Sequence, residues 1–441
     1  MFIASITLIG SMFGTMLSGV KSEVFGRKKA ILTTHFVALM GFLSLRYANS
    51  VPMLYLGNFL GGYTEGVYLV VSPLYVSEIN QPKIRNYTLS FNMLSFFFMF
   101  SITYIIGAMV SWRQTISILM VFPIIFSFTL SVCPQSPTWH MLRGRRSRAL
   151  KVLTELRGDE AIANREVMRI EQNLKEQKTV KGNHVNSASY IKDQLAVLTK
   201  GPFIRPCSVL IVLFAIGWQW TGEASLTFYT VDIIQEFKIP INPYWISAGV
   251  GIYQFFVAIA GVFISAAVPR RKYYIVSGVF VIVGAAILGA SVHLQKYEWF
   301  IKLLNEYTIL RWLPVMALLL YFGGYTSGYV TVPYMLLGEL LPSNARSVGS
   351  CIVVQCSNVS FFFVTKFTPM CVKSLGMDGL FWLFSIIATL SVIFAYFCVP
   401  ETFGVSLEEI EEHYRGSCYP NDIQNNNNKT KEYVNGSYKN E

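Results

Sequence analysis

The sequence predicts an all-α membrane protein in which two helical bundles are joined by a polar helical domain. The 441-residue chain is 53% hydrophobic and only 14% charged, whereas ordinary soluble domains are about 25% charged. Apolar runs of about 20 residues recur along it, each long enough to cross a hydrocarbon core of about 30 Å. One basic segment, at positions 134–205, divides these runs into two groups. A soluble protein with many buried helices would instead spread its charge between them.

The basic segment fixes the predicted topology. It holds fourteen Lys or Arg and seven Asp or Glu residues, an excess of seven within the chain's formal charge of +11. Because membrane proteins keep Lys- and Arg-rich loops in the cytoplasm, we expect this domain there. The same bias explains the positive charge without nucleic acid as a partner, and leaves the lipid bilayer as the expected surroundings.

Five spans are predicted before the basic segment. The first, Met1–Val20, lacks the charged start and cleavage site of a signal peptide. It runs into a basic loop, so Met1 is expected outside the cell. The other four are Ala30–Leu45, Met53–Val76, Thr88–Val110 and Ile116–Val132.

Six spans are predicted after it. They are Pro206–Ile234, Pro243–Val268, Tyr273–Leu294, Leu310–Leu337, Ser347–Val372 and Leu380–Val399. The chain thus divides into a bundle of five spans (1–133), a cytoplasmic helical domain (134–205), a bundle of six spans (206–399) and a cytoplasmic tail (400–441). The Asn-rich composition predicts disorder in the tail after about residue 417.

No pattern in the sequence indicates an enzyme, a metal site or a cofactor. There is no phosphate-binding loop, no cluster of metal ligands and no nucleophile beside a base. Most of the seven cysteines lie in or beside apolar spans and form no CxxC pair, which favours small buried side chains over a disulfide or zinc framework.

An acidic residue and an arginine recur at matching places in the two halves. The segment from Pro73 to Glu78 is followed seven residues later by Arg85, and the segment ending in Glu339 is followed seven residues later by Arg346. Each acid ends a span that runs toward the cytoplasm, and each arginine opens the next span. Two similar helical halves joined by a cytoplasmic domain are the parallel-repeat layout of major-facilitator transporters.

Longer motifs make this likeness specific. They are Gly19-x-x-x-Glu23-x-x-Gly26-Arg27-Lys28, the repeated acid–arginine pairs, Pro134-Gln135-Ser136-Pro137-Thr138-Trp139 and Pro400-Glu401-Thr402-Phe403-Gly404. With them, up to about Gly416, the chain resembles the sugar-porter family of the major facilitator superfamily, most closely insect-type facilitated trehalose/hexose transporter-like proteins. The first motif has Glu23 where the family usually has Asp.

The resemblance implies alternating access, in which two bundles rock about a central site and carry a hexose or trehalose down its gradient or with a proton. It also implies a plasma-membrane location and a cytoplasmic gate of charged residues that latches one state. The gate residues are Glu23, Arg27, Glu78, Arg85, Arg271, Glu339 and Arg346. The alternative is that these residues only cap helices and anchor loops.

The sugar site implied by the resemblance is partly lost. Three polar residues of the family pattern remain, Gln219, Gln254 and Asn358, with aromatic faces from Trp218, Trp220 and Tyr334. Trp218 replaces a glutamine of the family, Ala224 an asparagine and Met93 a glutamine. A sugar site needs several polar groups aimed at hydroxyls, so we expect fewer hydrogen bonds to the substrate than in relatives.

Two acids, Glu65 and Glu223, lie inside predicted spans. A carboxylate in a membrane is costly enough to suggest a function, such as receiving a proton, a cationic substrate or the hydrogen bonds of sugar hydroxyls. The alternative is a structural acid that is protonated or paired by neighbouring helices.

Family members have twelve spans, and this chain begins at what resembles their second. Either the sequence is a truncated gene model, or the protein is an eleven-span form with impaired transport. Two rival functions follow: a non-transporting sugar sensor or regulatory homologue, and a transporter of another small solute.

Overall fold

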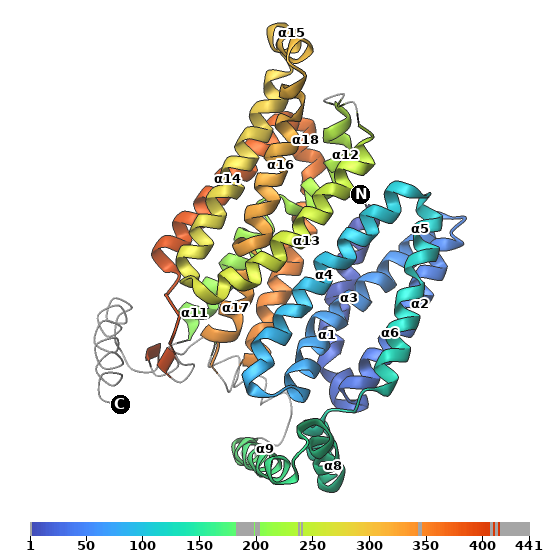
Figure 1. Ribbon diagram of the computed structural model, residues 1–441, viewed down its shortest axis with the longest axis vertical. Coiled ribbons are helices and arrows are strands. Elements are labelled where there is room, and N and C mark those ends of the chain that lie inside the picture. The colour runs from blue at the N-terminus through green and yellow to red at the C-terminus, as the bar shows by residue number, and fades with distance from the viewer. Residues whose placement is uncertain are drawn as a thin grey trace.

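The structure is a computed structural model that describes residues 2–181, 198, 203–236, 239, 241–342, 346–405, 409–410 and 413–414. Throughout this described part the regular structure is helical. Two helical bundles stand side by side, one built from α1–α6 and the other from α11–α18 (Figure 1). Helices α8 and α9 lie at one end of the first bundle, and α15 lies at the opposite end of the molecule.

The first bundle contains six helices. They are α1 (Phe2–Phe25), α2 (Arg27–Arg46), α3 (Val51–Ile79), α4 (Pro82–Met109), α5 (Trp112–Leu119) and α6 (Val121–Val132). Helices α1 and α3 pack with their backbones in contact, because glycines line the crossing. A Cβ atom at Gly62 would lie 1.7 Å from the carbonyl oxygen of Thr7, and one at Gly14 would lie 2.2 Å from that of Tyr63.

The polar domain forms three described helices, α7 (Pro137–Leu142), α8 (Arg146–Arg157) and α9 (Glu160–Lys181). A small core of Leu153, Ala163 and Val167 holds α8 against α9. The Arg157 guanidinium group binds both carboxylate oxygens of Glu166 at 2.8 Å and donates to the carbonyl of Ile79 at 2.9 Å. It thereby joins the domain to the end of α3.

The second bundle holds the larger apolar core. Its elements are α11 (Ile204–Val212), η1 (Leu213–Trp218), α12 (Glu223–Glu236), α13 (Pro243–Ala267), α14 (Arg270–Leu294), α15 (Glu298–Glu306), η2 (Thr308–Trp312), α16 (Leu313–Gly324), η3 (Tyr325–Tyr329), α17 (Thr331–Leu340) and α18 (Arg346–Cys398). The long α18 changes direction at Gly376, whose φ is 78°. This break separates the last two predicted spans.

Two predicted spans of this bundle are interrupted. The sequence predicts single spans at 206–234 and 310–337, but each contains a π-helical stretch, η1 and η3. After η1 the chain turns at Gly222, with φ of 93°, before α12 begins. A Cβ atom there would lie 2.1 Å from the Phe384 ring, so both the backbone angle and the space require glycine.

Six segments of the described chain are long and apolar enough to cross a membrane by length and composition. They are Trp112–Val132, Ile204–Thr227, Pro243–Ser265, Arg270–Leu294, Ile309–Leu340 and Val348–Cys398. The last of these includes two predicted spans. The full division into five and six spans therefore stays a prediction, and the predicted disorder after about residue 417 lies outside the described residues.

Hydrogen bonds join the two bundles at several places. The Thr15 hydroxyl donates to the side-chain oxygen of Gln355 at 2.8 Å, linking α1 to α18. The Ser101 hydroxyl donates to the carbonyl of Gly251 at 2.6 Å, linking α4 to α13. The two bonds join uncharged groups.

Candidate substrate site and cytoplasmic gate

An ion pair closes the end of the first bundle that carries the polar domain. The Arg27 guanidinium group lies 3.0 Å from a carboxylate oxygen of Glu78, and both side chains are at most 10% exposed. The Ser136 hydroxyl donates to the other Glu78 oxygen. Glu78 therefore ties the start of α2 and the start of α7 to the end of α3.

The second bundle repeats this arrangement. Arg270 pairs with Glu339 at 3.5 Å, and the Thr402 hydroxyl donates to the other Glu339 oxygen at 2.6 Å. The sequence assigned Arg271 to this gate, but the pairing guanidinium group is that of Arg270. Because successive residues point about 100° apart around a helix, Arg271 instead lies over the ring of Tyr396, 4.9 Å from its centre.

The motifs that begin at Pro134 and Pro400 cap helices that lie earlier in the chain. The backbone N–H groups of Arg270 and Arg271 donate to the Glu401 carboxylate at 2.8 and 3.2 Å. In the first half the amide oxygen of Gln135 accepts the N–H of Lys28 at 2.9 Å. The start of α14 thus faces a carboxylate and the start of α2 a neutral amide.

Of the remaining gate residues, only Glu23 has a described side chain. The Glu23 side chain is exposed, and its backbone carbonyl accepts the Trp139 indole N–H at 2.9 Å. Arg85 and Arg346 lie in α4 and α18, and their side chains lie outside the described residues. Their role in the gate stays a prediction.

The first interrupted span breaks at residues 219–222, between η1 and α12, and this break packs against α18. The Gln219 side chain donates to the Ser357 hydroxyl at 2.9 Å, and the Trp220 indole N–H donates to the Ser360 hydroxyl at 2.8 Å. Between these serines in the chain is Asn358, 8% exposed, whose Nδ2 is buried without a hydrogen-bond partner in the described part of the chain. A buried orphan donor calls for an acceptor, and a sugar hydroxyl can supply one.

Three aromatic rings meet beside this break. Trp218 and Tyr334 lie edge to face with ring centres 5.3 Å apart, and Phe214 packs against both. The Trp218 indole N–H donates to the hydroxyl of Tyr325 in η3. The breaks of the two interrupted spans are therefore in contact.

The structure thus groups most of the predicted sugar residues. Gln254 is buried on α13, 3% exposed, and no described contact joins it to the others. The sequence interpretation missed Tyr325, Ser357 and Ser360, which bind the break. The i,i+3 spacing of the two serines around Asn358 was the available signal.

The two acids lie in opposite bundles. Glu65 on α3 is exposed and interacts electrostatically with Tyr334 of the other bundle. Glu223 is half-buried and begins α12. Neither forms an ion pair with a Lys, Arg or His whose side chain the structure describes.

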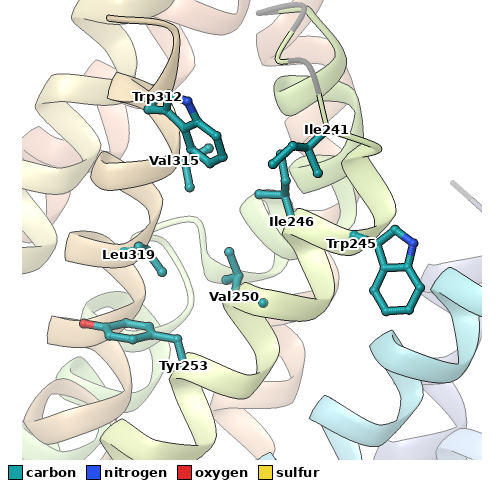
Figure 2. Close-up of a pocket in the computed structure, with 9 residues that line it drawn as sticks. Ile241, Trp245, Ile246, Val250, Tyr253, Trp312, Val315 and Leu319 are labelled. Carbon is teal, nitrogen blue, oxygen red and sulfur yellow. The ribbon is translucent and has the colours of Figure 1, made fainter. Parts of the chain in front are cut away.

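A separate cavity of about 410 Å³ lies between α13 and α16 (Figure 2). Its walls are Ile241, Trp245, Ile246, Gly249, Val250, Tyr253, Trp312, Val315 and Leu319. None of the predicted sugar residues lines it. Since a sugar needs several polar partners, this apolar cavity does not have the chemistry of the substrate site.

The fold consists of two helical bundles that repeat one arrangement of an arginine paired with a glutamate. A profile of the "Sugar (and other) transporter" family matches residues 1–414, and the chain belongs to this family. It is therefore a transporter and not an enzyme, and the family resemblance of its motifs is confirmed.

Named relatives are insect transporters. The facilitated trehalose transporter Tret1 of Apis mellifera ligustica is 27% identical over 420 residues, covering 94% of this chain and 80% of that protein. A Tret1-2 homolog of Drosophila simulans is 27% identical over 416 residues, covering 94% and 82%.

Solved structures confirm the major-facilitator fold. The proton:xylose symporter XylE bound to 6-bromo-6-deoxy-D-glucose matches with a TM-score of 0.72 and 19% identity, covering 94% of this chain and 88% of that one. The inward-open conformation of XylE from E. coli matches with a TM-score of 0.74 and 19% identity, covering 93% and 88%.

Proposed function

We propose that the protein carries a sugar, a hexose or trehalose, across the plasma membrane by alternating access. The observation that carries this proposal is the contact between the two interrupted spans at Trp218, Tyr325 and Tyr334. In transporters with discontinuous helices the substrate site lies where such breaks meet near the membrane midplane. The named relatives, which are trehalose transporters, support a sugar as the substrate.

The proposed site combines the grouped residues with Gln254. Hydroxyl groups of the sugar hydrogen-bond to Gln219, Gln254 and Asn358, and rings of Trp218, Trp220 or Tyr334 cover its apolar faces. Gln219 donates one amide hydrogen to Ser357. Its amide oxygen is an acceptor and can take a hydrogen bond from a sugar hydroxyl. The orphan Nδ2 of Asn358 becomes satisfied when substrate binds.

The proposed gate is a latch at the end of each bundle. The Arg27–Glu78 and Arg270–Glu339 pairs each hold two helix ends together, and Arg85 and Arg346 complete the latch. Hydrogen bonds to charged groups contribute about 1.5–3 kcal/mol each, enough to bias a two-state equilibrium.

The proposed topology has five spans, a cytoplasmic helical domain and six spans, with Met1 outside. Helices α8 and α9 lie at the gated end, and α15, between two apolar helices, lies at the other (Figure 1). The positive charge of positions 134–205 supports placing the gated end in the cytoplasm.

Counterflow in proteoliposomes tests the proposal. Vesicles preloaded with glucose, trehalose or xylose should take up the same labelled sugar. Asn358→Ala should reduce this uptake, whereas Ser95→Ala, a change at an exposed position of α4, should not. Sugar binding without counterflow would favour a sensor, and counterflow of a cationic solute alone would favour a different substrate held by Glu65.

A further inference from the structure

Glu223 lies at the break of the first interrupted span. It is the first residue of α12, directly after the turn at Gly222. One carboxylate oxygen accepts the Thr227 hydroxyl at 3.1 Å, and the Tyr325 side chain lies close enough to interact electrostatically with the carboxylate. Tyr325 also accepts the indole N–H of Trp218, so the contact between the two breaks lies beside Glu223.

A residue of the first bundle also lies near Glu223. Tyr104 on α4 interacts electrostatically with Glu223, and its hydroxyl donates to the carbonyl of Thr227 at 3.3 Å. Tyr321 on α16 also faces Glu223, and its hydroxyl donates to the carbonyl of Thr221 at 3.1 Å. The carboxyl group therefore lies where α12, the second interrupted span and the first bundle meet.

The described groups around Glu223 are uncharged hydroxyls. Titratable neighbours come from α4 (Tyr104), α16 (Tyr321) and η3 (Tyr325). On the α18 side, the neighbouring contact is the hydrogen bond between Ser225 and Thr368 at 2.7 Å. The described ion pairs include no cation at Glu223. An acid inside a membrane span that lacks a cationic partner is the kind of group that carries protons in pumps and transporters.

We propose that Glu223 binds the proton that is carried together with the substrate, which rests on the sugar transport proposed above. The carboxylate takes up one proton from one compartment, forming a single O–H bond, and releases the same proton to the other compartment after the bundles move. As a carboxylate it accepts from Thr227; once protonated it is itself a donor. Loss of the negative charge also changes its interaction with Tyr325, which links protonation to the contact between the two breaks.

Two transport measurements on the full chain in proteoliposomes test this inference. Counterflow at equal pH reports sugar exchange, and uptake under an inward proton gradient reports coupling. The wild type should accumulate sugar under the gradient. Glu223→Gln should keep counterflow and lose accumulation, while Glu223→Asp should keep some of both. Glu298→Gln is the matched control, since Glu298 also begins a helix but lies on α15, outside the spans.

Each outcome decides. Counterflow in the wild type without any response to the gradient, or accumulation retained in Glu223→Gln, overturns the proton site and leaves sugar transport standing. If Glu223→Gln does not fold, two other measurements decide: transport by Glu223→Asp, and the pH of the outer solution when sugar is added to wild-type vesicles. A proton-coupled carrier makes that solution more alkaline, because it takes up protons with the sugar, and an uncoupled carrier does not. Absence of counterflow for every sugar overturns the proposed function, and the proton site with it.

Discussion

Gln135 accepts the backbone N–H of Lys28 in the first half, where Glu401 accepts that of Arg271 in the second. The same contact is thus made once by an amide and once by a carboxylate. A negative charge at a helix start is stabilised by about 0.3–1 kcal/mol. The first half therefore carries the weaker cap.

Gln135→Glu should accordingly raise the midpoint of thermal unfolding, and Glu401→Gln should lower it. Both variants change one charge at equivalent sites, so each is the control for the other. Unfolding of the purified protein in detergent, followed by intrinsic fluorescence, measures the midpoints. Shifts of the same sign in both variants would contradict the capping role.

Removing an arginine of the gate should loosen only its own bundle. Arg27→Gln and Arg270→Gln each lose a charge-assisted bond worth about 1.5–3 kcal/mol, or roughly tenfold or more in the open population. Each half carries a half-exposed cysteine just before its motif, Cys133 and Cys398. Maleimide labelling should rise at Cys133 in the first variant and at Cys398 in the second. Equal labelling of both cysteines in both variants would argue against two separate latches.

Arg157→Ala should release α8 and α9 from α3. The Arg157 side chain is 4% exposed and that of Glu166 is 27% exposed, so the loss of their charge-assisted hydrogen bonds costs about 1.5–3 kcal/mol. Arg146→Ala is the control, because its pair with Glu171 spans 3.7 Å and is largely exposed, where the cost is about 0–1 kcal/mol. Limited proteolysis should cut α8 and α9 faster in the first variant only; equal rates would exclude the anchor.

His140 should make the protein less stable in mild acid. Burial, together with the Arg145 and Arg148 guanidinium groups, lowers the pKa of His140 below its usual value. Its Nδ1 is buried and without a partner in the part of the chain that the structure describes. The unfolded chain therefore binds a proton that the folded chain rejects, and stability falls as the pH drops below about 6.5.

His140→Gln should remove this part of the loss. The midpoint of thermal unfolding is measured for both proteins across a series of pH values. Below about pH 6.5 the midpoint of the wild type should fall more steeply than that of the variant. A constant difference at all pH values would show that His140 does not titrate in that range.

Gly222→Ala should destabilise the second bundle strongly, because the new methyl group meets the Phe384 ring at 2.1 Å and the backbone has φ of 93°. Gly144→Ala isolates the backbone cost, since Gly144 has φ of 69° but open space around its Cβ position. The left-handed conformation alone costs about 1–2 kcal/mol. Equal unfolding midpoints for the two variants would show that packing against Phe384 contributes nothing.

Composition and repeated motifs were enough to predict the helical halves and to single out the two glutamates that form ion pairs at the helix ends. Glu78 and Glu339 could be found because each ends a span at the same distance before an arginine. The sequence could not decide whether Arg270 or Arg271 pairs with Glu339, because this depends on the residue at which α14 begins. One position changes the direction of a side chain by about 100°.

The breaks at η1 and η3 were missed because hydropathy does not distinguish a π-helical turn from an α-helical one. The η1 stretch is apolar and aromatic, and the short η3 stretch lies inside a longer apolar segment. Tyr104 and Tyr325 were missed for a related reason: a tyrosine in a span reads as core or lipid contact. Only the fold brings them beside Glu223.

The glycine crossing of α1 and α3 has a mechanical consequence. Two helices whose backbones touch at Gly14 and Gly62 cannot slide or bend independently, so they form a stiff spine. The second bundle instead has two joints, at η1 and η3. We therefore expect bending during the transport cycle to occur mainly in the second bundle. The first bundle should move more nearly as a rigid body.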